Sequence, residues 1–110
     1  MIDGTNTFAG TDVVVVAPPP GIPRQLLVDY LERCRRNLAE LKEAVASRDF
    51  KHTGVVGHRL KGSGSAYGAN RLTELGALIE TASARQALEE LGPLVEGLQD
   101  FLGRVEVAGV

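Results

Sequence analysis

The stretch GHRLKGSGSAYG, residues 57–68, holds four glycines, one histidine and two cations within twelve residues. Such a stretch suits either a phosphate-cradling loop of an α/β protein or a helix that carries a reactive histidine. A Walker loop requires lysine directly after its second glycine, but Ser63 follows Gly62. A dinucleotide-binding loop requires a third glycine where Tyr67 stands. No alternation of strands and helices surrounds the stretch, so we interpret it as a helix.

Apolar residues recur with helical periodicity on both sides of this stretch. The stripe from Leu27 to Val45 alternates spacings of four and three residues, and the stripe from Leu88 to Val105 alternates three and four. The predicted helices run from Pro23 to about Ser47, from Phe50 to about Ser65, from Asn70 to about Ala84, and from about Leu88 to Val105. Four amphipathic helices with short connections predict an all-α fold, an antiparallel four-helix bundle.

The chain before the first predicted helix has a different character. Residues 1–12 are mostly small and polar, and we expect them to form a flexible tail. Val13–Val16 could form a strand, but no partner strand is recognisable elsewhere. We therefore expect these valines to lie extended against the helical core. This divides the chain into a flexible or extended N-terminal segment, 1–22, and the helical bundle, 23–107.

Composition limits the classes of function. The 110 residues carry a formal net charge of −2 with cations and acids interleaved, so no nucleic-acid partner is expected. The one cysteine, Cys34, excludes an internal disulfide and leaves too few thiols for a zinc–thiolate site. No apolar run approaches the roughly 20 residues of a membrane span, and Met1–Gly10 lacks the pattern of a secretory signal. We expect a cytoplasmic monomer with no membrane partner.

The predicted second helix gathers its chemistry on one face. His58, Lys61, Gly62 and Ser65 are spaced i, i+3, i+4 and i+7, which places them on one side of a helix. Lys61 can neutralise an anion and disfavours the imidazolium form of the neighbouring histidine. An exposed, neutral histidine beside a cation is suited to accept a phosphoryl group.

The glycines of this helix need a reason, because each interior glycine costs about 1 kcal/mol relative to alanine. For Gly57 and Gly64 we expect that a neighbouring helix packs closely against them. Gly62 lies one turn from His58 on the outward face, so its missing side chain leaves the imidazole open to a large partner. The other histidine, His52, lies about 240° around the helix from His58. The two cannot share a metal ion, and we interpret His52 as a surface residue.

The stretch HRLKGSGSAYG resembles the motif of histidine-containing phosphotransfer (HPt) domains, roughly H-x-L-K-G-S-x-x-x-x-G. The matched positions are His58, Leu60, Lys61, Gly62, Ser63 and Gly68. The segment Leu72–Ser83 resembles the third helix of the family, although Ile79 replaces the leucine before Glu80. The resemblance covers about Leu27 to Val105.

The resemblance implies a relay. His58 would accept a phosphoryl group, through Nε2, from an aspartyl phosphate on a receiver domain and pass it to another receiver. Lys61 would stabilise the phosphate, while Arg59, Gly62 and Ser65 would contact the receiver. Response-regulator receivers and a hybrid sensor kinase are the implied partners. The receiver supplies Mg²⁺, so this chain needs no cofactor, and it contains no ATP-binding or kinase motif.

One position departs from the family pattern. Many members carry an amide or a cation late in the third helix, near the phosphohistidine, whereas this chain has Glu80. A carboxylate there would repel phosphate unless it turns away or bonds the other nitrogen of His58, which would orient the ring. The alternative function is a helical module that docks a signalling partner without chemistry. The intact set of His58, Lys61 and Gly62 argues against that alternative.

Overall fold

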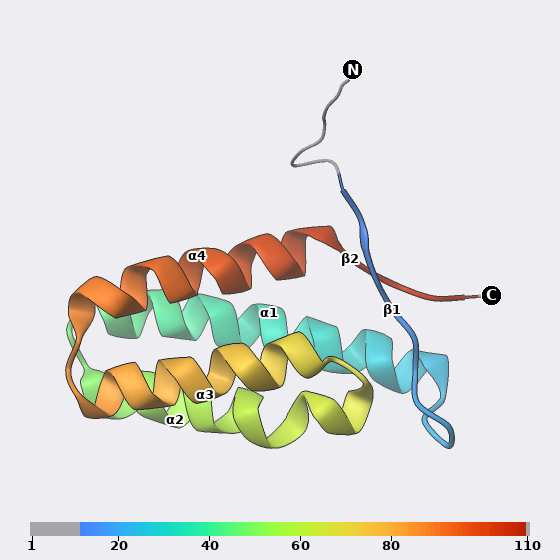
Figure 1. Ribbon diagram of the computed structural model, residues 1–110, viewed down its shortest axis with the longest axis horizontal. Helices are drawn as coiled ribbons and strands as arrows, with labels where there is room; N and C mark the ends of the chain where they lie inside the picture. The colour runs from blue at the N-terminus through green and yellow to red at the C-terminus, as the bar shows by residue number, and fades with distance from the viewer. Residues whose placement is uncertain (1–11, 110) are drawn as a thin grey trace.

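The computed structural model describes residues 12–109, and these form four helices and two short strands (Figure 1). The helices are α1 (Arg24–Ala46), α2 (Phe50–Ser63), α3 (Asn70–Ala84) and α4 (Leu88–Arg104). Each helix packs against the next, and α4 packs back against α1. Consecutive helices run in opposite directions in Figure 1. The prediction of four helices as the dominant structure is confirmed. The flexible tail predicted for residues 1–12 lies outside the described residues, except for Asp12.

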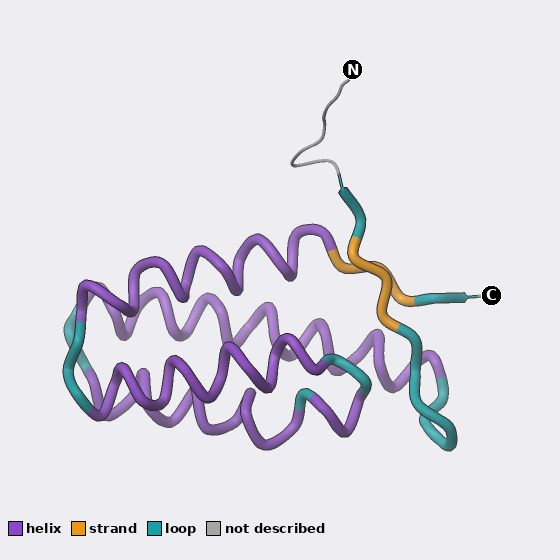
Figure 2. The backbone as a smooth tube through the Cα atoms, in the orientation of Figure 1, coloured by secondary structure: helices purple, strands orange, loops and turns teal. Residues whose placement is uncertain are grey.

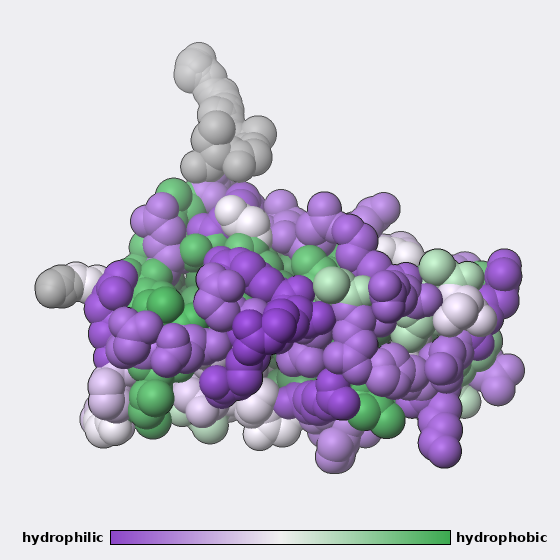
Figure 3. Space-filling view, turned by 180° about the vertical axis from the view of Figure 1, so that it is seen from behind, coloured by the Kyte–Doolittle hydropathy of each residue, from purple (hydrophilic) through white to green (hydrophobic). Residues whose placement is uncertain are grey.

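The predicted apolar stripes supply the core. The buried members of the two stripes are Leu27, Leu31, Cys34, Leu41, Leu91, Val95, Leu98, Leu102 and Val105, and the two middle helices add Val56, Leu60, Leu72, Leu75 and Ile79. Full burial of a side chain of this kind contributes about 1.5–3 kcal/mol. The 3.6-residue period therefore decides which face of each helix turns inward, and the opposite faces stay free for function. The polar covering of one face of the molecule is visible in Figure 3.

Local signals determine the ends of α2. The Asp49 carboxylate accepts a hydrogen bond from the His52 backbone N–H at 3.1 Å, which caps the first turn. After Ser63 the chain tightens into a 3₁₀ turn, η2 (Ser65–Tyr67). Gly68 follows with φ of +83°, a left-handed conformation that glycine adopts without strain. The turn redirects the chain into α3.

The two strands correct two predictions. β1 (Val14–Val16) pairs in parallel with β2 (Val105–Val107), so the valine run does have a partner strand (Figure 2). Val105 was predicted to continue the last helix, but α4 ends at Arg104. The predicted helix was extended to Val105 because an apolar residue at this position is buried whether it belongs to a helix or to a strand. The alternating Val-Glu-Val sequence of β2 favours a strand.

The last helix contains a proline near its start. Pro93 was predicted to be tolerable if the helix begins between Ala87 and Gly92. α4 begins at Leu88, within that range, and Pro93 lies in its second turn, where it has no N–H to donate to the carbonyl of Glu89. Along the described residues, 12–109, no helix has the combination of length and apolar character needed to cross a membrane.

Candidate functional site

His58 lies on the outer face of α2, with 72% of its side chain exposed. Its Nδ1 is 2.9 Å from Oε2 of Glu80 on α3. The other oxygen of the same carboxylate, Oε1, accepts a hydrogen bond from Lys61 Nζ at 3.0 Å. Glu80 therefore joins the histidine and the lysine across the junction of two helices.

The charge of Glu80 determines which nitrogen of His58 is free. The hydrogen bond from Lys61, followed by that from His58, lowers the pKa of Glu80 from its ordinary value of 4.5. Glu80 is thus a carboxylate at neutral pH, and a carboxylate only accepts hydrogen bonds. In the neutral ring, Nδ1 must therefore carry the proton and donate it to Glu80. Nε2 then has a lone pair and, among the described residues, no hydrogen-bond partner.

The glycines of α2 behave as expected from the sequence. A Cβ at Gly57 would lie 2.7 Å from the backbone nitrogen of Glu80, and one at Gly64 would lie 2.6 Å from the backbone nitrogen of Thr73. Both glycines permit α3 to approach α2 closely, which confirms the predicted reason for them. A Cβ at Gly62 would meet no atom of the described residues within 4 Å. The surface one turn beyond His58 is open.

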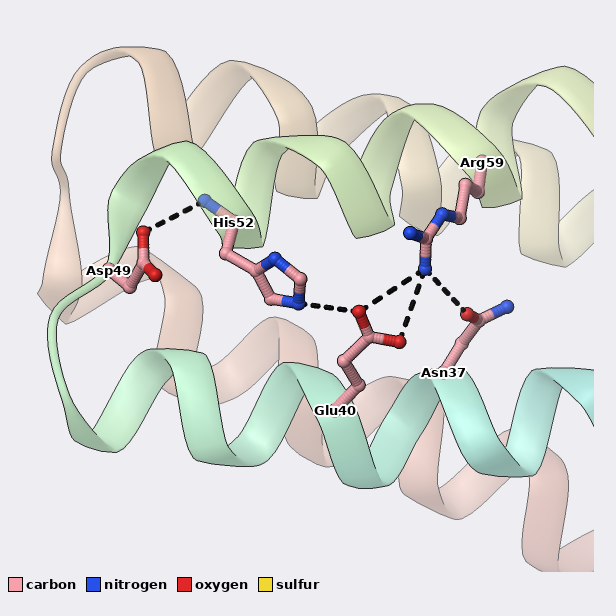
Figure 4. Close-up of polar contacts among 5 residues, drawn as sticks. All are labelled: Asn37, Glu40, Asp49, His52 and Arg59. Atoms are coloured by element: carbon pink, nitrogen blue, oxygen red, sulfur yellow. Dashed lines mark hydrogen bonds and ion pairs between the residues drawn. The ribbon is translucent and has the colours of Figure 1, made fainter.

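Arg59 extends from α2 toward α1, as the close-up in Figure 4 shows. Its Nη1 donates to Glu40 Oε1 at 3.1 Å and to Asn37 Oδ1 at 3.4 Å. The same carboxylate of Glu40 pairs with Nε2 of His52. Arg59 is half exposed, yet its guanidinium is already held by α1. The receiver contact predicted for Arg59 stays a prediction, and the sequence could not identify these partners on α1.

Ser65 does not belong to the helical face on which the i, i+7 spacing placed it, because α2 ends at Ser63. The Ser65 backbone N–H donates to Thr73 Oγ1 at 2.8 Å, and its hydroxyl donates to the same oxygen at 3.1 Å. These contacts tie the 3₁₀ turn to α3. Ser63 faces the bundle, where its hydroxyl lies 2.7 Å from the Tyr30 hydroxyl.

A shallow groove beside His58 was missed by the sequence analysis. The hollow has a volume of about 610 Å³ and runs along α2 and the end of α3; its lining residues are Phe50, Lys51, Gly54, Val55, His58, Arg59, Glu80, Ser83, Ala84 and Gln86. Val55 is 41% exposed and lies one turn before His58. An apolar residue at i−3 on the outward face was the available signal. Val55 lines a groove only because the fold brings the small residues Ser83 and Ala84 of α3 near it.

In the part of the chain that the structure describes, no three His, Cys, Asp or Glu side chains are grouped so that they could hold a metal ion. The site brings together one exposed imidazole, one carboxylate and one ammonium group on two of four packed helices. This is the set of groups that the resemblance to HPt domains predicts, with Glu80 added.

The family comparison agrees with this class. The family model described as Hpt domain matches residues 25–108, and the chain belongs to this family. Hpt domains transfer phosphoryl groups in two-component signalling, work with receiver domains, and are phosphocarriers rather than kinases. The resemblance identified from the sequence is thereby confirmed. Searches of curated proteins and of solved structures found no match to the chain.

Proposed function

We propose that the protein accepts a phosphoryl group on Nε2 of His58 from the aspartyl phosphate of one receiver domain and passes it to the aspartate of another. The observation that carries the proposal is the contact between His58 Nδ1 and Glu80 at 2.9 Å on a side chain that is 72% exposed. This contact orients the imidazole with its nucleophilic nitrogen toward solvent. A donor receiver within a hybrid sensor kinase and an acceptor response regulator are the proposed partners.

The transfer step needs no added base, because no proton has to be removed from the attacking nitrogen. The lone pair of Nε2 attacks phosphorus, the N–P bond forms, and the P–O bond to the donor aspartate breaks. The aspartate leaves as a carboxylate, and the ring retains its proton on Nδ1. In the onward step, the acceptor aspartate attacks phosphorus and the ring leaves as neutral imidazole. The receiver contributes Mg²⁺ to both steps.

Glu80 and Lys61 have complementary roles in this proposal. The phosphorylated ring carries a positive charge, which the Glu80 carboxylate stabilises through Nδ1–H. Lys61 Nζ holds the other oxygen of Glu80 and brings a cation near the phosphoryl group. Because Lys61 and His58 both occupy its oxygens, Glu80 is directed away from the incoming phosphate. The carboxylate therefore supports phosphorylation rather than opposing it.

The groove beside His58 is the proposed contact surface for the receiver. Val55 offers an exposed apolar side chain on one side of the histidine, and Gly62 leaves bare backbone on the other. Lys51 and Arg59 place cations at the edge, where they match the acidic active site of a receiver and act mainly on the association rate. Such a contact belongs with transient interfaces of about 1,200 Å² or less.

The proposal is tested by incubating the protein with a panel of purified, phosphorylated receivers. At least one receiver is expected to transfer acid-labile phosphate to the protein, and peptide mapping under alkaline conditions is expected to locate it on His58. The phosphorylated protein, once isolated, should then phosphorylate a second receiver. Phosphate on any other residue, or a stable complex with a receiver that never yields phosphohistidine, would contradict the proposal.

A further inference from the structure

The backbones of α2 and α3 come into close contact at two glycines. Gly57 of α2 faces α3, and Gly76 of α3 faces α2. A Cβ at Gly57 of α2 would lie 2.7 Å from the backbone nitrogen of Glu80. A Cβ at Gly76 of α3 would lie 2.3 Å from the backbone nitrogen of Lys61. Each glycine therefore lets the backbone of its own helix rest against a residue of the polar cluster formed by His58, Lys61 and Glu80.

The two contacts are buried and lie close in sequence to the members of the polar cluster. Gly57 directly precedes His58, and Gly76 lies one turn before Glu80. At the same junction, His58 Nδ1 lies 2.9 Å from Glu80 Oε2, and Lys61 Nζ lies 3.0 Å from Glu80 Oε1. We propose that Gly57 and Gly76 are positioning residues, which set the separation of α2 and α3 so that Glu80 holds Nδ1 of His58. The effect on phosphoryl transfer rests on the function proposed above, whereas the effect on the imidazole does not.

A methyl group at Gly76 cannot be accommodated by a side-chain rotation, because the atom it meets belongs to the backbone of Lys61. Carbon needs about 3.5 Å from a non-bonded neighbour, so the helices would have to separate by about 1 Å. A hydrogen bond of 2.9 Å stretched by that amount is no longer a hydrogen bond. A buried hydrogen bond between Thr53 and Ser83, with 2.6 Å between the hydroxyl oxygens, ties the same helices elsewhere and limits how far they can tilt.

The test compares Gly76→Ala with Gly97→Ala, a matched change in the interior of α4. A Cβ at Gly97 would meet Leu75 Cδ2 at 3.6 Å, an ordinary contact, so this control removes a helical glycine without moving a helix. The ¹⁵N shifts of the His58 ring report the tautomer of the neutral imidazole. The wild type and Gly97→Ala are expected to carry the proton on Nδ1. Gly76→Ala is expected to lose this preference.

Phosphoryl transfer from a receiver supplies the second readout. Gly76→Ala is expected to slow transfer to His58 by between about tenfold and a hundredfold, and by no more than Glu80→Ala does, because it misplaces the carboxylate by about 1 Å. Glu80→Ala removes the carboxylate itself. If the glycine acts through Glu80, the double variant is expected to be no slower than the slower single variant.

Three outcomes would overturn the inference: an unchanged tautomer in Gly76→Ala, an unchanged transfer rate, or losses that add fully in the double variant. The last outcome would assign the glycines a purely structural role. Should Gly76→Ala fail to fold by circular dichroism, Gly57→Ala provides the same test through the longer 2.7 Å approach to Glu80. A wild-type protein that shows the tautomer but never acquires phosphate would contradict the proposed function and leave the positioning role intact.

Discussion

Two histidines on α2 face a glutamate from a neighbouring helix, and the two glutamates contact different ring nitrogens. His52 contacts Glu40 of α1 through Nε2, and 37% of its side chain is exposed. His58 contacts Glu80 of α3 through Nδ1, and 72% of its side chain is exposed. The histidine–carboxylate pair recurs, but the nitrogen that it occupies differs.

This difference decides the chemistry. Nε2 is the outermost nitrogen of the ring, whereas Nδ1 lies beside the carbon that bears Cβ. Glu40 contacts Nε2 of His52 and leaves Nδ1, whereas Glu80 contacts Nδ1 of His58 and leaves Nε2. A phosphoryl group needs an accessible lone pair. In the proposed function, the pair on the α1 side therefore ties helices together, and the pair on the α3 side leaves Nε2 of His58 free to attack phosphorus.

The largest expected effect separates the two histidines directly. His58→Gln is expected to abolish phosphate uptake from a receiver, because it removes the attacking nitrogen. Its stability should change by no more than about 0.5 kcal/mol, since an exposed side chain leaves no cavity. His52→Gln is the matched control and should accept phosphate at the wild-type level. Acid-labile phosphate on the His58 variant would show that the nucleophile lies elsewhere.

The two glutamates provide the next comparison. Glu80→Ala is expected to slow transfer by between about tenfold and a hundredfold, because the ring loses its orientation and its charge partner. Glu40→Ala, which removes the carboxylate facing His52, is expected to change the rate by less than about twofold. Rapid-quench measurement of phosphohistidine gives both rates. Equal losses in the two variants would mean that the position of the carboxylate does not matter.

Access around His58 is expected to have a smaller effect. Gly62→Gln introduces a side chain where the described residues leave open space, so transfer from a receiver should slow by roughly tenfold. Helix propensity predicts that this variant is more stable than the wild type by up to about 1 kcal/mol. Transfer kinetics and chemical denaturation together separate the two effects. A variant that transfers at the wild-type rate would remove Gly62 from the interface.

The smallest expected effect concerns pH. The pKa of Glu80 is lower in the folded protein than its ordinary 4.5, so its contacts stabilise the fold above that value and are lost as pH falls through the lowered pKa. Carbon-detected NMR of the carboxyl group follows this titration. Lys61→Ala is expected to raise the pKa of Glu80 more than His58→Gln does, because Lys61 is the larger cause. The reverse order would mean that the hydrogen bond from His58, rather than the one from Lys61, is the main cause of the lowered pKa of Glu80.

The order of the residues was sufficient to predict the four helices, the outward position of His58 and the open surface at Gly62. All three follow from periodicity within one helix, where residue spacing dictates the face. The capped turn at Asp49 is equally local, because its carboxylate reaches a backbone N–H only three residues away. Such features depend on neighbours in the chain and can be predicted from the order of the residues.

The contacts between elements depend on how the helices and strands pack in three dimensions. The pairing of β1 with β2 joins the two ends of the described chain, so neither three-residue strand could indicate its partner. The contact of Glu80 with Nδ1 rather than Nε2 depends on the separation and rotation of α2 and α3. Gly57 and Gly76 determine that separation by backbone contact. A helical period specifies the direction of a side chain, whereas the distance to a neighbouring helix depends on the packing of both surfaces.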